Sequence, residues 1–210
     1  MRKTTIATIL GALLLVSTAQ AVPIPAVTFD DTSSSTFVSV SETVGWKFNV
    51  TAPILVGALG VFDSDLNGLL GGHDVGIWNN ANNSLITSAT VQAGTVNPLL
   101  NQFRYAQIAP ILLGVGSYTI GATWGTGATS DDYIANTTNF QTMSAITFQG
   151  AEYIEAASLT RPTTDADFFS NGMFGPNFQV VPEPGTLVLV GAGLFAMAVC
   201  SKRLRQSNAI

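Results

Sequence analysis

Apolar and polar residues alternate in several parts of the chain, which is the pattern of β-strands with one buried face. Trp46, Phe48 and Val50 alternate with polar residues, and the stretch GSYTIGATWG (116–125) repeats the alternation. The two patterns predict strands at 46–51 and 117–124. They also place Trp46 and Trp124 on buried faces, where core packing is favoured over a role as exposed sugar-stacking platforms.

Residues 54–62 (ILVGALGVF) are apolar on both faces and predict a central strand that is covered on both sides. Within this strand, Gly57 and Gly60 predict bulges or close packing. Further strands are predicted at 75–78, 85–91, 103–108, 145–148 and 178–181, separated by turns at 79–83, 94–98 and 125–132. Short strands at regular spacing, without an internal repeat, predict an all-β fold: an antiparallel β-sandwich of jelly-roll type.

The N-terminus has the three parts of a secretory signal peptide. Arg2 and Lys3 form a basic region, residues 6–16 are apolar, and Ala19 and Ala21 have the small-x-small spacing of a cleavage site. Cleavage by signal peptidase after residue 21 is therefore expected. An uncleaved anchor is disfavoured because the apolar region is shorter than the ~20 residues that span a bilayer. Residues 22–181 would then form the folded domain.

This domain is strongly acidic. It holds twelve of the thirteen acidic residues but only three basic ones, Lys47, Arg104 and Arg161, so its net charge is −9. Such a charge argues against nucleic acid or anionic lipid as a partner. The single cysteine, Cys200, lies outside the domain, which therefore has no disulfide of its own.

Residues 63–74 (DSDLNGLLGGHD) have the spacing of a calcium-binding loop. Side-chain oxygens would come from Asp63, Asp65, Asn67 and Asp74, and a backbone carbonyl from Leu69. The twelfth position is Asp rather than the longer Glu, and the flanking segments are strand-like rather than helical. The competing interpretation is an ordinary polar turn, because Asp, Asn and Gly are also the residues that turns use.

Catalytic residues are harder to find in this sequence. His73 is the only histidine and has no cysteine or second histidine to complete a nucleophilic set, so a local hydrogen bond is the expected role. Acidic pairs occur at 131–132, 152/155 and 165/167, and Asp131 or Glu152 would be the acids of a glycan hydrolase. Two carboxylates alone specify little, and such pairs are common on the surface of an acidic protein. No catalytic residue is assigned.

The C-terminus combines three further features. Pro182 and Pro184 favour an extended chain, the apolar residues 186–200 predict a short helix, and Lys202, Arg203 and Arg205 follow this run. A 15-residue helix is about 22 Å long, less than the ~30 Å of a hydrocarbon core, so it predicts a marginal transmembrane anchor. The basic residues predict a cytoplasmic end and leave the domain outside. A permanent anchor that is never processed is the alternative.

The residues Pro182-Glu183-Pro184-Gly185, the apolar helix and the basic end together resemble the PEP-CTERM sorting signal, here over residues 182–206. The resemblance implies a Gram-negative bacterium that makes extracellular polysaccharide. It also implies cleavage near the motif by an exosortase. The domain is similar, over residues 44–178, to a β-rich domain of unknown function that often carries such tails, which implies an architecture but no activity.

The sequence thus predicts an exported protein without enzymatic activity, held briefly at the periplasmic side of the inner membrane by its C-terminal helix. From there it would reach the cell surface or extracellular matrix, with a structural or binding role in exopolysaccharide or biofilm. A carbohydrate-binding module is the first alternative and a secreted glycan hydrolase the second.

Overall fold

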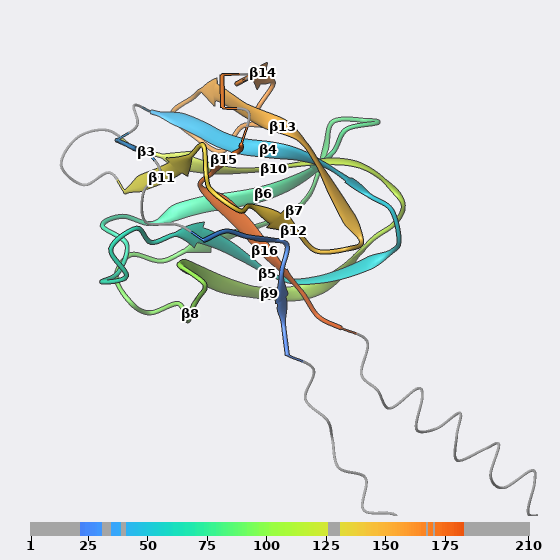
Figure 1. The fold of residues 1–210 in the computed structure, drawn as a ribbon, viewed down its shortest axis with the longest axis horizontal. Coiled ribbons are helices and arrows are strands. Elements are labelled where there is room, and N and C mark those ends of the chain that lie inside the picture. The colour runs from blue at the N-terminus through green and yellow to red at the C-terminus, as the bar shows by residue number, and fades with distance from the viewer. Residues whose placement is uncertain are drawn as a thin grey trace, which may run out of the picture. The chain divides into compact units, whose positions relative to one another are not determined.

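A computed structural model describes residues 22–30, 35–38, 41–125, 131–166, 168–169 and 171–182 of the 210-residue chain. The strands in these residues pair antiparallel throughout, and together they form an all-β fold (Figure 1). Residues Val22–Glu183 form one compact unit. The predicted signal peptide, transmembrane helix and basic end lie outside the described residues. Among the residues that are described, no helix is long and apolar enough to span a membrane.

Eleven strands form two larger sheets. The six-stranded sheet has the order β14 (Thr164–Asp165), β13 (Ile146–Glu155), β4 (Glu42–Val50), β10 (Gly116–Trp124), β6 (His73–Asn79) and β7 (Ser84–Val91). The five-stranded sheet has the order β1 (Ile24–Pro25), β16 (Pro176–Val180), β5 (Ile54–Phe62), β9 (Phe103–Leu113) and β8 (Leu99–Leu100).

Two smaller sheets complete the described part of the fold. One contains β15 (Met173–Phe174), β11 (Asp132–Ala135) and β3 (Ser35–Val38), and the other pairs β12 (Gln141–Thr142) with β2 (Val27–Thr28). None of these short strands was predicted from the sequence, because two to four residues are too few to show a periodic pattern.

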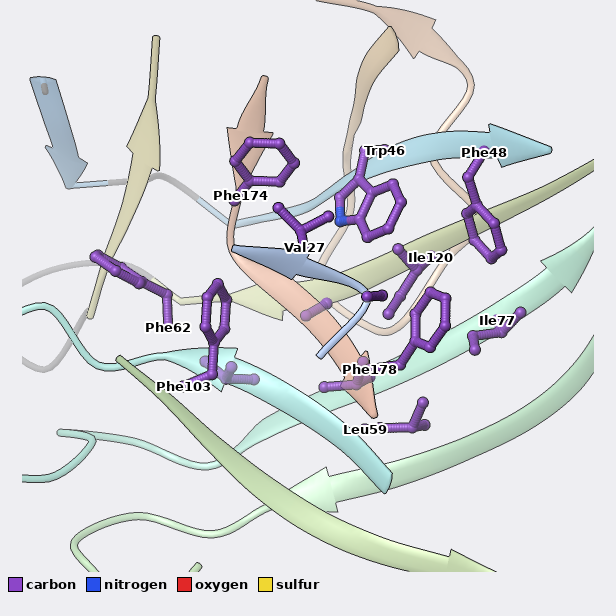
Figure 2. Close-up of a cluster of buried hydrophobic side chains, with 14 of the residues drawn as sticks. Val27, Trp46, Phe48, Leu59, Phe62, Ile77, Phe103, Ile120, Phe174 and Phe178 are labelled. Carbon is purple, nitrogen blue, oxygen red and sulfur yellow. The ribbon is translucent and has the colours of Figure 1, made fainter. Parts of the chain in front are cut away.

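The core lies between the two larger sheets. Figure 2 shows Trp46 and Phe48 of β4 close to Phe178 of β16. The rings of Trp46 and Phe178 are stacked, with centroids 5.9 Å apart and an interplanar angle of 12°. The indole N–H of Trp46 also donates to the carbonyl of Pro176 at 2.9 Å, which satisfies its polar atom inside the core. Aromatic residues of β4 and β16 thereby fix one sheet against the other.

The prediction of a central strand at 54–62 is confirmed in both its bounds. β5 lies between β16 and β9, and eight of its nine residues are buried. The roles predicted for its two glycines are also confirmed. Gly57 lies at a shift in the register of β5 with β9, and a Cβ on Gly60 would lie 2.5 Å from the ring of Tyr105.

Two boundaries predicted from the sequence are wrong. The loop predicted at 63–74 ends earlier, because His73 and Asp74 already belong to β6 and pair with Val91 and Thr90 of β7. The turn predicted at 125–132 also ends earlier, since Asp132 is the first residue of β11. In both segments the Asp and Gly content favoured a turn, but cross-strand pairing extended a strand into it.

Candidate functional site

The sorting signal begins where the five-stranded sheet ends. β16 is held on both sides, by β1 through Val180 and Ile24 and by β5 through Val180 and Val56. In the described part of this segment, the last backbone hydrogen bond runs from the N–H of Val181 to the carbonyl of Leu55, at 2.8 Å. Pro182, the next residue, is half-buried. Because proline has no N–H to continue the ladder, regular pairing stops at the first residue of the predicted motif.

A close contact fixes this exit point. A Cβ built on Gly57 of β5 would lie 2.4 Å from a methyl carbon of Val181. Only glycine at position 57 therefore leaves room for Val181 to lie flat on β5. β1 runs antiparallel to β16, so residue 24 and residue 180 are neighbours. The chain consequently enters and leaves the folded unit at the same end of the sheet (Figure 1).

Comparison with protein families identifies the segment that follows. Residues 180–203 match the family described as the PEP-CTERM protein-sorting motif. The chain carries a PEP-CTERM sorting motif. The match confirms the resemblance drawn from the sequence, and it extends from the last residue of β16 past Pro182, Glu183, Pro184 and Gly185 to Arg203. Of the basic residues predicted to end the signal, Lys202 and Arg203 fall inside the match and Arg205 outside it.

The motif supports an exported protein that an exosortase sorts to the cell surface. The exosortase is therefore its processing partner. A comparison of the chain with curated proteins finds no match. The signal-cleavage residues Ala19 and Ala21, and the motif from Glu183 onwards, lie outside the described residues. The structure therefore describes the segment that joins the sorting motif to the folded domain, from Pro176 to Pro182.

The predicted calcium ligands have other hydrogen-bonding partners. Asp63 accepts from Arg104 Nε at 2.6 Å and from the backbone N–H of Gly68 at 3.1 Å. The Leu69 carbonyl accepts from the N–H of Gly94 at 2.7 Å. The geometry thus gives Asp63 and Leu69 a structural role, holding the 63–72 loop against its neighbours.

The remaining calcium candidates are also engaged within the protein. Asp65 accepts a hydrogen bond from the side-chain amide of Asn67, and Asp74 accepts one from Thr90 at 2.6 Å. Over the described ranges, no group of three or more His, Cys, Asp or Glu side chains is placed to hold a metal ion. Calcium binding stays a prediction.

Arg104 and Asp63 form a buried ion pair, with side-chain exposures of 5% and 1%. Arg104 also donates to the carbonyls of Asn97 at 3.2 Å and Leu66 at 3.2 Å. The guanidinium therefore links β9 to two loops, because each of its three nitrogens donates to a protein oxygen. Sequence reasoning missed this pair because its members are 41 positions apart.

His73 and Asp131 form a second buried cluster. His73 Nε2 lies 2.8 Å from Asp131 Oδ2, and its Nδ1 lies 2.5 Å from the carbonyl of Thr123. The imidazole also packs on Trp124, with ring centroids 4.8 Å apart. Both ring nitrogens are thus occupied and the residue is 3% exposed, which leaves no nitrogen to activate a nucleophile. The expectation of a loop residue with a local hydrogen bond is wrong, because His73 lies in β6 and its two partners are 50 and 58 positions away in the chain.

The surroundings of Asp131 favour the ionised form of its carboxyl group. Burial opposes its ionisation, but the hydrogen bond from His73 and those from the N–H groups of Leu70 and Gly71 together lower its pKa. The indole of Trp124 donates to its carbonyl at 2.8 Å. A general acid needs a raised pKa, so this environment does not suit Asp131 to protonate a leaving group.

Glu152 forms a third cluster on the outer face of the six-stranded sheet. It is 4% exposed and contacts Lys47 at 3.5 Å and Thr119 at 3.1 Å. Burial raises its pKa, against the opposing effects of Lys47, Thr119 and Arg161. Lys47 also donates to Asp165 at 2.6 Å, and this hydrogen bond raises the pKa of Lys47.

The acidic pairs of the sequence are not brought together as pairs. Asp131 faces His73 while Asp132 begins β11, and Glu152 is buried while Glu155 is exposed. Asp165 contacts Lys47, and residue 167 lies outside the described residues. All three tryptophans are at most 5% exposed, which confirms the core positions of Trp46 and Trp124 and leaves no indole as a sugar platform.

Proposed function

We propose that this protein is a non-enzymatic β-sandwich of jelly-roll type that exosortase processing delivers to the extracellular matrix, where it has a structural or binding role in exopolysaccharide. The observation that carries the proposal is the position of the sorting motif directly after the last sheet hydrogen bond, at Val181. Cleavage beyond that point leaves every described strand in the released unit. The tail is thus a removable sorting signal on an intact domain.

The strand order supports the jelly-roll assignment. In the five-stranded sheet, the order β1-β16-β5-β9 places the first strand beside the last. In the six-stranded sheet, the order β4-β10-β6-β7 places β10 between two strands that precede it in the chain. The wrapped, double Greek-key connectivity of a jelly roll would produce this order, with β13 added at the edge of β4. Jelly rolls serve many functions, so the topology by itself supports an architecture and no activity.

The pairing of charged side chains inside the domain supports a non-enzymatic role. Each of the three basic residues in the domain has an internal partner: Lys47 contacts Glu152, Arg104 contacts Asp63, and Arg161 donates to Asn80. Among the buried carboxylates, Asp63 and Glu152 contact cations and Asp131 contacts His73. Such groups stabilise the fold, and they leave a surface that repels anionic polymers. A neutral polysaccharide is therefore the proposed matrix contact.

The test follows the tail in the producing cell. Replacement of Pro182, Glu183 and Pro184 by alanine should leave full-length protein in the membrane fraction, whereas the parent protein appears in the medium or at the surface as a shorter form. The matched control combines Gln92→Ala, Ala93→Ser and Thr95→Ala, three exposed positions in the loop between β7 and β8. Continued release of a shortened triple variant would contradict sorting through the motif. Unchanged matrix mass after gene deletion would contradict the matrix role.

A carbohydrate-binding module is the second candidate, and one hollow favours it. This hollow, of about 410 Å³, is lined by Thr137, Thr138, Asn139, Phe140 and Asn171. Amide, hydroxyl and aromatic groups without charge are the groups that bind neutral sugars. Asn171→Ala should weaken binding to a neutral glycan array at least tenfold, while Asn82→Ala should leave it unchanged. Equal binding by both variants would exclude this hollow.

A further inference from the structure

Several loops lie at the end of the domain from which the sorting tail leaves. β16 and β9 run in the same direction, because both pair antiparallel with β5, and β16 ends opposite Val56, near the start of β5. Two loops at this end join the larger sheets, and the β6–β7 hairpin closes beside the start of β10. We call this region the tail end of the domain, and its described residues are 22–23, 51–53, 80–83, 114–115, 143–145 and 181–182.

The tail end contains no charged residue in these ranges. Glu42 begins β4, Asp63 follows β5 and Asp74 lies at the start of β6, so these three carboxylates lie at the opposite end of the sheets. A cation does reach the tail end, since Arg161 donates to the side chain of Asn80 at 3.0 Å. The carboxylates of this acidic domain are therefore placed away from the point where the tail leaves.

Large apolar side chains are exposed at or beside the tail end. Val22 is 77% exposed, Leu112 is 68% exposed and Val115 is 70% exposed. Leu112 lies opposite Leu55 of β5, whose carbonyl accepts the last hydrogen bond from Val181, and Val115 lies in the loop after β9. These residues belong to separate segments of one end of the domain and do not form a continuous patch. Scattered apolar side chains are ordinary on a surface, so the tail has to indicate what they contact.

The tail limits what its end of the domain can face. Only residues 183–185 separate Pro182 from the apolar run that begins at Thr186. At no more than about 3.6 Å per residue, the four steps from Pro182 to Thr186 span at most about 14 Å. When the apolar run is inserted in a bilayer as the predicted anchor, the tail end must lie within this distance of the anchor. This step rests on the proposed sorting through the tail.

We infer that the tail end is a membrane-contact surface, where Val22, Leu112 and Val115 enter the headgroup layer of the bilayer that holds the anchor. Exposed apolar side chains at a charge-free end are favoured in this layer, because contact with lipid removes their surface from water. Lipid phosphates repel carboxylates, and the carboxylates lie at the opposite end. Three side chains bind a bilayer only weakly without an anchor, so cleavage of the tail ends the contact.

The test reconstitutes the chain from residue 22 onwards into phosphatidylcholine vesicles and reads an environment-sensitive fluorophore on a single cysteine. In a Cys200→Ser background, Val115→Cys carries the label at the tail end. Val96→Cys is the matched control, because Val96 is 77% exposed and lies beyond β7, in the loop whose Gly94 pairs with Leu69 at the opposite end. We expect the label at residue 115 to emit at shorter wavelength, and spin-labelled lipid to quench it about twofold more strongly than the label at residue 96.

A further variant tests the apolar contact itself. Leu112→Asp places a carboxylate beside the label at residue 115 and should return its emission towards that in water, whereas an unchanged emission would contradict an apolar contact. Far-UV circular dichroism checks that each variant is folded.

The remaining outcomes separate the contact from the anchor. Equal emission and quenching at residues 115 and 96, in chains that float with the vesicles, would overturn the contact alone. A chain that does not float with the vesicles would overturn the anchor, and the contact with it. A label at residue 115 that leaves water only in membranes containing the exosortase would overturn the inference, because the tail end would then bind the enzyme.

Discussion

Asp63 and Arg104 join the 63–72 loop to β9 through a 2.6 Å hydrogen bond between two buried charges. Removal of the cation alone leaves a carboxylate buried without its counter-ion. We therefore expect Arg104→Met to lower the free energy of unfolding by about 3–5 kcal/mol in urea denaturation. The double variant Asp63→Leu with Arg104→Met removes both charges and should recover much of this loss. A double variant as unstable as the single one would show that the loss has another cause.

Asp131 should make the protein less stable in acid. Its pKa is lowered in the folded state, so its contribution is fully present above the unfolded value of about 3.9 and is lost as the pH falls through the folded pKa. The stability difference between the parent and Asp131→Asn should therefore shrink as the pH falls from about 5 to 2. Urea unfolding at a series of pH values measures it. A difference that stays constant over this range would contradict the assigned contacts.

Glu152 should have the opposite pH dependence. Burial raises its pKa, so the folded state retains a proton that the unfolded state releases. The stability of the parent relative to Glu152→Gln should therefore fall as the pH rises from about 4.3 through the folded pKa. The same series of urea titrations reports it. If this difference instead grows with pH, the Lys47 and Arg161 charges outweigh burial.

Gly57 should control how firmly the exit segment, residues 180–184, is held against β5. A valine at this position collides with Val181 and should lower the free energy of unfolding by about 1–3 kcal/mol. It should also speed proteolysis between residues 180 and 184. Gly114→Val is the control, since no atom lies within 4 Å of a Cβ built there. Equal rates of proteolysis in both variants would show that the contact between Gly57 and Val181 does not hold the segment at residues 180–184.

The two interpretations of the loop at 63–74 differ in the effect of calcium, and the polar-turn interpretation predicts an unchanged melting temperature. Asp63 is committed to Arg104 and the Leu69 carbonyl to Gly94, so an ion would have to replace two existing hydrogen-bonded contacts. Thermal unfolding of the full chain with millimolar calcium and with chelator provides the measurement. A higher melting temperature with calcium would support the interpretation of the 63–74 loop as a metal site.

Sequence periodicity predicted the long strands and missed the short ones. β5 and β10 were predicted closely because long apolar or alternating runs define a strand whatever its partners are. β11 and β15 are only four and two residues long, and they pair with each other and with β3 across long stretches of the chain, although both carry buried core residues. The sorting motif was readable because its residues are contiguous.

The buried polar clusters had no signal in the sequence. His73 and Asp131 are 58 positions apart, and neither spacing nor composition connects them. The Asp-rich loop at 63–74 matched a calcium spacing, but that pattern did not show that Arg104 would reach Asp63 from another strand. Contacts of this kind are set by the tertiary fold, which local patterns do not specify.

The position of β16 between β1 and β5 has a mechanical consequence. A pull on the chain beyond Pro182 acts along β16, and it loads the hydrogen bonds to both neighbouring strands in shear, so that they resist together. The rate of forced unfolding, rather than equilibrium stability, then governs survival under load. A domain held by this end would withstand drag from flowing water better than one whose terminal strand peels from an edge.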